Sequence, residues 1–201
     1  TWPVRAEAPR LAHGNAQLAA WGQSMIDAED LVYEANERYG MEYAILRPTV
    51  VCGRTAKFAE SVISGLMRNP ERAEQLNAAW GTMQWVHGVD VARAALIAGH
   101  DPAARNETFI VAGPEIVTAF GLLETLWEIT HMEGGDNPFS GLAKEKQPPL
   151  RKFDIGKIQN ALDFTAEATV RQCVEELLGL YEFYSSASLK MPQSPGVLQI
   201  E

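Results

Sequence analysis

Apolar and polar residues follow one another along the chain in patterns that predict amphipathic helices separated by short strands. From Trp21 to Tyr39 the apolar residues recur at helical spacing, and Gly40 follows as a helix stop. Residues 41–53 form instead a short apolar run with several β-branched side chains, which favours a buried strand of a parallel sheet. The same criteria predict, further along, a helix over 56–68, a strand and then a helix within 83–100, a strand over 107–113, a helix over 118–130, a short helix within 153–164 and a helix over 169–184.

Three residues carry stronger local signals within these elements. Pro48 has no N–H to donate to a strand ladder, so the strand must end or lie at a sheet edge there. Asp90 and Thr118 each stand where a side chain can cap the N-terminus of the following helix.

The order of these helices and strands predicts an α/β fold. The chain has 201 residues, which suffice for one domain with a sizeable core, or for a domain with a smaller lobe. We divide it into a lead-in loop over 1–20, a main domain over 21–185 and a polar tail over 186–201.

Composition narrows the classes of partner and compartment. Hydrophobic residues make up 46% and charged residues 21%, as in ordinary globular proteins, but the net charge of −9 lacks the positive field that nucleic acid or an anionic membrane requires. The longest apolar runs are far shorter than a membrane span, and no signal-peptide pattern is found. The two cysteines, Cys52 and Cys173, form neither a C-x-x-C pair nor a zinc spacing. We therefore expect a cytoplasmic protein with reduced thiols and no metal site.

Four segments in order resemble the second half of an extended short-chain dehydrogenase/reductase, the NAD-dependent epimerase/dehydratase family. "WGQSMIDAE" is similar to the family's Y-G-x-S-K helix, and "LRPTVVCG" to its R-P-x-x-V-Y-G strand. "WVHGVDVARAAL" is similar to V-H-V-D-D-V-A, and "FDIGKIQNALDF" to D-x-S-K-x-x-x-x-L-G-F. The resemblance implies the C-terminal portion of a Rossmann-like fold with a small substrate-binding lobe.

The same resemblance shows that the family's proton-transfer residues have been replaced. In the family the Tyr hydroxyl exchanges a proton with the substrate, and the Lys ammonium favours the phenolate. Here these two positions hold Trp21, whose indole N–H does not titrate usefully, and Met25, which carries no charge. Ser24 keeps its family position but has no base beside it. A positioned acid or base contributes roughly 100- to 10,000-fold in rate, so hydride chemistry by the usual route should be crippled.

A dinucleotide cofactor would need residues that this chain does not contain. No G-x-x-G-x-x-G or G-x-G-x-x-G occurs, so the helix start that cradles phosphates is absent from this sequence. The resemblance implies that NAD(P) binds only if a partner supplies the N-terminal half of the fold. The cofactor would then lie against the end of the R-P-x-x-V strand, at Pro48, Thr49, Val50 and Val51.

The resemblance also implies candidate substrate residues, and each has a purely structural alternative. Cys52 stands for the family's Tyr in V-Y-G, and a small buried side chain is the alternative to a reactive thiol. Gln84 lies near the position where many sugar-nucleotide enzymes carry an Arg, which puts a nucleotide sugar in doubt. His87 lies in an apolar strand, where a hydrogen-bonded core histidine is the alternative to a substrate ligand.

A chain that lacks the first half of this fold would leave its strand at residues 43–51 unpaired on one side. Unpaired apolar edges are costly and prone to aggregation, so we expect a separate N-terminal Rossmann half or a second copy of the chain as partner. Three functions remain open: a small-molecule enzyme with non-redox chemistry, such as dehydration, cyclisation or isomerisation; an NAD(P)-dependent oxidoreductase or epimerase completed by another chain; and a non-catalytic partner subunit.

Overall fold

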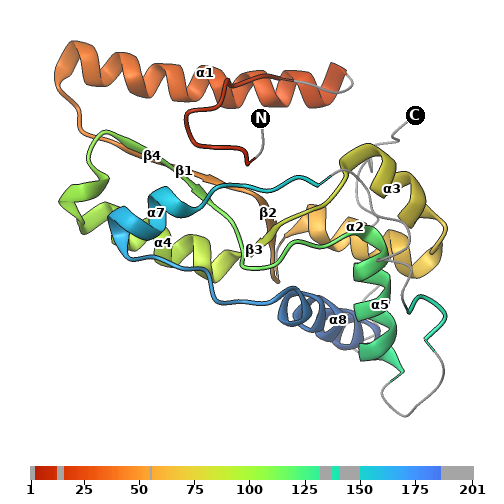
Figure 1. Cartoon of the computed structure of the whole chain (residues 1–201). Helices are drawn as coiled ribbons and strands as arrows, with labels where there is room; N and C mark the ends of the chain where they lie inside the picture. The colour runs from red at the N-terminus through yellow and green to blue at the C-terminus, as the bar shows by residue number, and fades with distance from the viewer. Residues whose placement is uncertain (1–2, 13–15, 55, 132–136, 141–149, 187–201) are drawn as a thin grey trace.

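The computed structural model describes residues 3–12, 16–54, 56–131, 137–140 and 150–186 (Figure 1). In order, its elements are α1 (Ala16–Tyr39), β1 (Ala44–Pro48), β2 (Val50–Cys52), α2 (Lys57–Arg68), α3 (Arg72–Trp80), β3 (Trp85–His87), α4 (Gly88–His100), the 3-10 helix η1 (Pro102–Ala104), β4 (Glu107–Val111), α5 (Ala119–Thr130), α7 (Gly156–Leu162) and α8 (Val170–Ser186). The predicted α/β class is confirmed. All of the predicted tail except residue 186 lies outside the described residues.

Within the described residues, four short strands form two separate parallel pairs, β1 with β4 and β2 with β3. The single strand predicted over 41–53 is therefore wrong, because the segment divides into β1 and β2 at Thr49. The break follows Pro48, as predicted from its missing N–H. The backbone N–H of Thr49 still donates to the carbonyl of Val111 at 3.0 Å, so the chain leaves the β1–β4 pair one residue after β1 ends.

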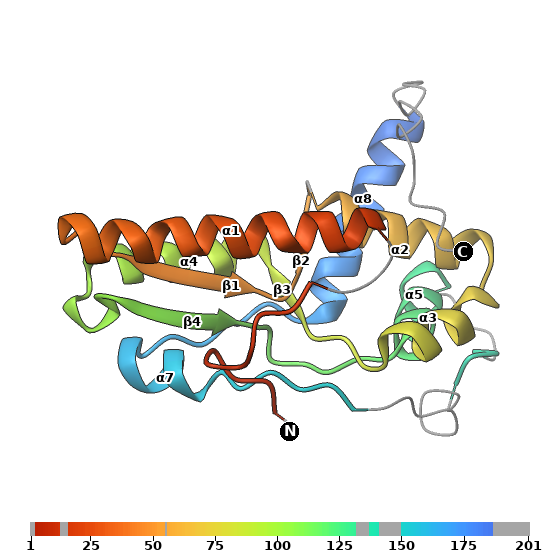
Figure 2. The same cartoon turned by 90° about the horizontal axis from the view of Figure 1, so that it is seen from above.

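The β1–β4 pair is covered by helices on its two faces (Figure 1). Helix α1 runs along one face, α4 packs against β1 from the other, and α7 lies beside β4 (Figure 2). One core fills this region, with Val86, Phe109, Val111 and Ile158 fully or almost fully buried. A second core lies in the lobe made by α2, α3, α5 and α8, around Ile63, Leu66, Leu122 and Leu177.

Strand β1 has only one partner within the described part of the chain. It pairs with β4, and its burial runs from exposed at Ala44 through half-buried residues to exposed at Pro48. The predicted burial of this strand is wrong because its second edge is open. Helix α1 is also poorly covered, since none of the α1 side chains that the structure describes is buried.

One helix start, one helix and one helix cap differ from the expectations. Helix α1 begins at Ala16, inside the segment expected as a lead-in loop, and α3 forms where no helix was predicted. The cap of α4 is His87, whose side chain accepts from the N–H of Val89, so the expected cap at Asp90 is wrong. Thr118 does cap α5, since its hydroxyl accepts from the N–H of Gly121 at 3.0 Å.

An ion pair joins α1 to β1. The guanidinium of Arg47 donates to both carboxylate oxygens of Glu29, at 2.8 and 2.5 Å, and also to the carbonyl of Ala6 at 2.7 Å. The hydrogen bonds to Glu29 are the main reason why the pKa of Arg47 is raised. Two parallel bonds of this kind fix orientation as well as distance.

We expect Arg47→Met to lower the free energy of unfolding by about 2 kcal/mol, because the half-buried Glu29 carboxylate loses two short hydrogen bonds and keeps only the longer contact with Arg10, at 3.5 Å. The matched control is Arg38→Met, which removes an exposed pair with Glu34 on the outside of the same helix. That change should cost about 0.5 kcal/mol or less. Urea unfolding followed by circular dichroism measures both values, and equal losses would show that Arg47 does not hold α1 in place.

Candidate functional site

Trp21 and Met25, the two positions predicted to have lost the family's proton-transfer residues, lie one turn apart on α1, and both are exposed. Trp21 is 65% exposed and Met25 is 49% exposed. The hydroxyl of Ser24 donates to the carbonyl of Trp21 at 2.7 Å, so it is engaged within the helix. In this chain, therefore, this face of α1 presents an indole and a thioether, with neither a titrating hydroxyl nor an ammonium.

The predicted cofactor-binding residues occupy the turn from β1 into β2. Pro48 ends β1, Thr49 is the joint, and Val50 and Val51 begin β2. The hydroxyl oxygen of Thr49 is buried and has no hydrogen-bond partner in the part of the chain that the structure describes. A buried polar atom without a partner is costly, and a ligand or a further protein segment at this point would satisfy it.

The residues present do not make a dinucleotide site by themselves. The Thr49 hydroxyl fits a polar ligand at the strand end, but one such group cannot hold a cofactor with two phosphates. The sequence has no glycine-rich phosphate loop, and Met25 offers no cation to a ribose.

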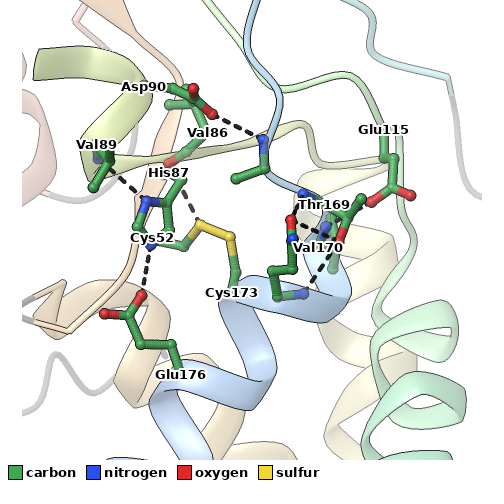
Figure 3. Close-up of a disulfide and its surroundings, with 12 residues drawn as sticks. Cys52, Val86, His87, Val89, Asp90, Glu115, Thr169, Val170, Cys173 and Glu176 are labelled. Atoms are coloured by element: carbon green, nitrogen blue, oxygen red, sulfur yellow. Dashed lines mark hydrogen bonds and ion pairs between the residues drawn. A yellow bond between two sulfur atoms is a disulfide. The ribbon is translucent and has the colours of Figure 1, made fainter. Parts of the chain in front are cut away.

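Cys52 and Cys173 are joined in a disulfide, with Cα atoms 5.8 Å apart (Figure 3). The expectation of reduced thiols is therefore wrong for this structure. The two residues are 121 positions apart in sequence, and they meet because the first turns of α8 pack against the carboxyl end of β2. The expected burial of Cys52 is confirmed, since it is 0% exposed and Cys173 is 1% exposed.

His87 links the end of β3 to the same helix. Its Nε2 lies 2.6 Å from the carboxylate of Glu176 on α8, and its Nδ1 accepts from the backbone N–H of Val89 at 3.2 Å (Figure 3). This pattern assigns the proton of the neutral ring to Nε2, which donates to Glu176. The ring also packs against Gly53, where an added Cβ would lie 3.0 Å from Nε2. Both ring nitrogens of His87 are thus engaged within the protein.

Gln84 also has both ends of its amide engaged. Its nitrogen donates to the carbonyl of Gly113 at 2.8 Å, and its oxygen accepts from the N–H of Phe153 at 3.1 Å. The side chain is almost completely buried. It connects the start of β3 to the segments that follow β4 and precede α7.

The structure brings only part of the predicted site together. Cys52 and His87 are register partners at the carboxyl ends of β2 and β3, whereas the turn at Thr49 lies at the amino end of β2 and the carboxyl end of β1. Gln84 lies beyond the opposite end of β3. Trp21 and Met25 lie on the exposed face of α1, and their roles as site residues stay predictions.

Four further residues hold α8 against the strand ends and were not singled out as a group from the sequence. Buried Asp90 accepts from the N–H groups of Glu167 and Ala168, at 3.1 and 3.0 Å. The carboxylate of Glu115 accepts from the N–H of Val170 at 2.6 Å (Figure 3). Together with Glu176 and Cys173, these contacts connect residues that are at least 55 positions apart, which no local pattern could pair.

The open pocket beside β1 is not at this site. It has a volume of about 440 Å³ and lies at the amino end of the strand, away from Pro48. Its walls come from the residues around β1, the end of α4 and η1, among them Glu42, Tyr43, Leu46, Ala98, Pro102 and Arg105.

Among the described residues, none of the helices is both long enough and apolar enough to cross a membrane. Across the same ranges, no three His, Cys, Asp or Glu side chains gather as they would around a metal ion.

Parallel strand pairs, covering helices and a lobe that closes on the carboxyl ends of the strands define an α/β protein of the Rossmann-like class. The model of the NAD dependent epimerase/dehydratase family matches residues 13–112. The chain belongs to this family of extended short-chain dehydrogenases/reductases, as its motifs predicted. No match was found among curated proteins.

Solved structures support the same fold at low sequence identity. UDP-glucuronic acid 4-epimerase from Bacillus cereus, in complex with NAD, is 15% identical with a TM-score of 0.69, over 91% of this chain and 56% of that one. UDP-glucose 4-epimerase from Thermotoga maritima, with UDP-glucose, is 18% identical with a TM-score of 0.58, over 82% and 54%. A short-chain dehydrogenase/reductase superfamily protein from Agrobacterium tumefaciens, with bound NAD, is 16% identical with a TM-score of 0.63, over 94% and 64%. The chain thus spans between about half and two thirds of each of these proteins.

Proposed function

We propose that the protein binds a small organic molecule beside the carboxyl ends of its strands and catalyses a non-redox reaction there, such as a dehydration, cyclisation or isomerisation. Ligands of open α/β sheets bind outside these strand ends. The unpartnered hydroxyl of Thr49 is a polar group at that point. The bound NAD and UDP-glucose of the solved relatives make small organic ligands the class to test first.

The observation that carries this proposal is the chemistry of two positions on α1. The family frame is retained around them, but Trp21 and Met25 cannot supply the titrating hydroxyl and the cation of a hydride-transfer site. A reaction that moves only protons and a leaving group does not need a reduced nicotinamide.

We expect the natively purified protein to transfer no hydride between NAD(H) or NADP(H) and either UDP-glucose or UDP-glucuronic acid. The absorbance of the reduced nicotinamide measures this directly. The double variant Trp21→Tyr/Met25→Lys, in the same preparation with any partner retained, restores the family's hydroxyl and ammonium, and it should gain measurable hydride transfer where a partner supplies the phosphate loop, because a positioned acid or base contributes roughly 100-fold or more in rate. Hydride transfer by the native protein would contradict the proposal and favour an NAD(P)-dependent oxidoreductase or epimerase whose cofactor half is on another chain.

The open surface around β1 and α1 favours a second candidate function, that of a partner subunit. Strand β1 has a free edge within the described residues, and the pocket of about 440 Å³ lies beside it. Along α1 and its flanks the large apolar side chains are exposed, namely Leu11, Trp21, Met25, Leu31, Tyr39 and Met41. An apolar surface next to an unpaired strand is a site for another protein segment.

The occupant that this surface fits best is a separate N-terminal Rossmann half, which would add a parallel strand to β1. NAD(P) would bind only to the complex, because this chain lacks the phosphate loop. A second copy of the chain is the alternative occupant. The expected compartment of either assembly remains the cytoplasm.

A further inference from the structure

The contacts that hold α8 against the strand ends are of two kinds. One is covalent, the disulfide between Cys52 on β2 and Cys173 on α8. The others are polar: the pair of His87 with Glu176, and the carboxylates of Asp90 and Glu115 on backbone N–H groups at the start of the helix (Figure 3). Because the polar contacts do not involve sulfur, they remain when the disulfide is opened.

The surroundings of Cys52 suit a thiol as well as a disulfide. Its Sγ lies 3.4 Å from the carbonyl oxygen of Val86, which is within reach of an S–H donor. A buried thiol with an acceptor in place leaves no polar group unsatisfied. The reduced state is therefore compatible with the same backbone, which is the condition for a bond that forms and breaks without unfolding.

The burial of both sulfur atoms restricts what can react with them. Cys52 is 0% exposed and Cys173 is 1% exposed, so a reagent reaches the bond only when α8 moves away from β2. Apolar side chains of α8, such as Val174 and Leu177, lie in the core of the lobe. When the disulfide is reduced, α8 therefore loses its covalent link to β2 and is held by its polar and apolar contacts alone.

We propose that Cys52 and Cys173 form a reversible thiol–disulfide latch that sets the mobility of α8 according to the redox state of small thiols around the protein. On closing, the two thiols lose two electrons and two protons to one molecule of oxidised glutathione, which becomes two molecules of glutathione. On opening, the same exchange runs in reverse through a mixed disulfide. A cytosolic disulfide is generally of this transient, redox-sensing kind, which agrees with the expected compartment.

The test uses the full chain, which contains no other cysteine. The protein is equilibrated at graded ratios of reduced to oxidised glutathione, starting from both states, and its thiols are then alkylated under denaturing conditions and counted by intact mass. We expect a single transition from no thiols to two, at the same ratio from both directions. Two thiols at every ratio, or none at any ratio, would overturn the latch.

Hydrogen exchange of the unmodified protein in its two redox states provides the second measurement. Amides of residues 170–179 should exchange about tenfold faster or more in the reduced state, while those of α1 stay unchanged. Cys173→Ala should match the reduced protein at every glutathione ratio. Glu115→Ala is the matched control, because it loosens the start of α8 equally in both redox states. The same exchange rate in α8 before and after reduction would also overturn the proposal.

Discussion

Gly113→Ala is expected to prevent the chain from folding. Gly113 follows β4 at the point where the chain crosses β3, and its carbonyl accepts from the side chain of Gln84. A Cβ added at Gly113 would lie 1.8 Å from the carbonyl oxygen of Trp85, which belongs to the backbone and cannot rotate away. The loss should exceed about 4 kcal/mol, which is close to the whole stability of a small domain.

Gly99→Ala is the matched control for this change. Gly99 lies in α4, and nothing is found within 4 Å of its added Cβ. Alanine is the better helix former, so this variant should be as stable as the native chain or more stable by up to about 1 kcal/mol. Far-ultraviolet circular dichroism and urea unfolding compare the two variants. A folded Gly113→Ala protein would show that β3 and the exit of β4 do not cross as described.

Asp90→Ala is expected to have the next largest effect, a loss of about 3 kcal/mol. The Asp90 side chain is 4% exposed, forms an ion pair with Arg93 at 2.8 Å and accepts the N–H groups of Glu167 and Ala168. Its removal leaves two N–H donors without their acceptor and takes from Arg93 one of its two carboxylate partners, the other being Glu167, so the segment that leads into α8 should detach.

Asp101→Ala is the matched control for Asp90. The Asp101 carboxylate also accepts a backbone N–H, that of Ala103 at 2.8 Å, but at an exposed cap where water can replace it. We expect a loss of about 1 kcal/mol or less. Urea unfolding measures both variants, and hydrogen exchange locates the change. Equal losses, or exchange in 165–170 that does not change in Asp90→Ala, would contradict the role given to Asp90.

The sequence predicted correctly those features that depend on contacts within a few residues along the chain. Pro48 ended its strand because a missing N–H acts at its own position, and Thr118 capped α5 through a bond three residues away. Helix α3 was missed because its segment is mostly polar and alanine-rich. Only Ala73, Leu76 and Asn77 are buried, and they become so through contacts with α5 and α2.

Only those parts of the candidate site that lie within the family motifs could be predicted from the sequence. These motifs predicted the strand end at Pro48, and the structure pairs Cys52 with His87 in register at the carboxyl ends of β2 and β3. The docking of α8 depends on Cys173 and Glu176, which pair with residues 121 and 89 positions away. Contacts over such distances depend on how the chain folds and leave no spacing in the sequence.

The burial expected for the β1 region fails for a related physical reason. An apolar strand is buried only if both its edges and faces are covered, and β1 has one open edge within the described residues. We propose that another protein segment covers β1 and the exposed face of α1 in the working assembly.

Hydroxyl-radical footprinting of the natively purified protein measures whether this surface is covered, because Met25 can be compared with Met67, a methionine of similar exposure on another helix. Met25 on α1 is 49% exposed and Met67 on α2 is 48% exposed. In the isolated chain both should oxidise at similar rates. In the native assembly we expect Met25 to be protected while Met67 is not. If Met25 stays as reactive as Met67, and intact mass shows this chain alone, the claim that α1 and β1 are covered by a partner is contradicted.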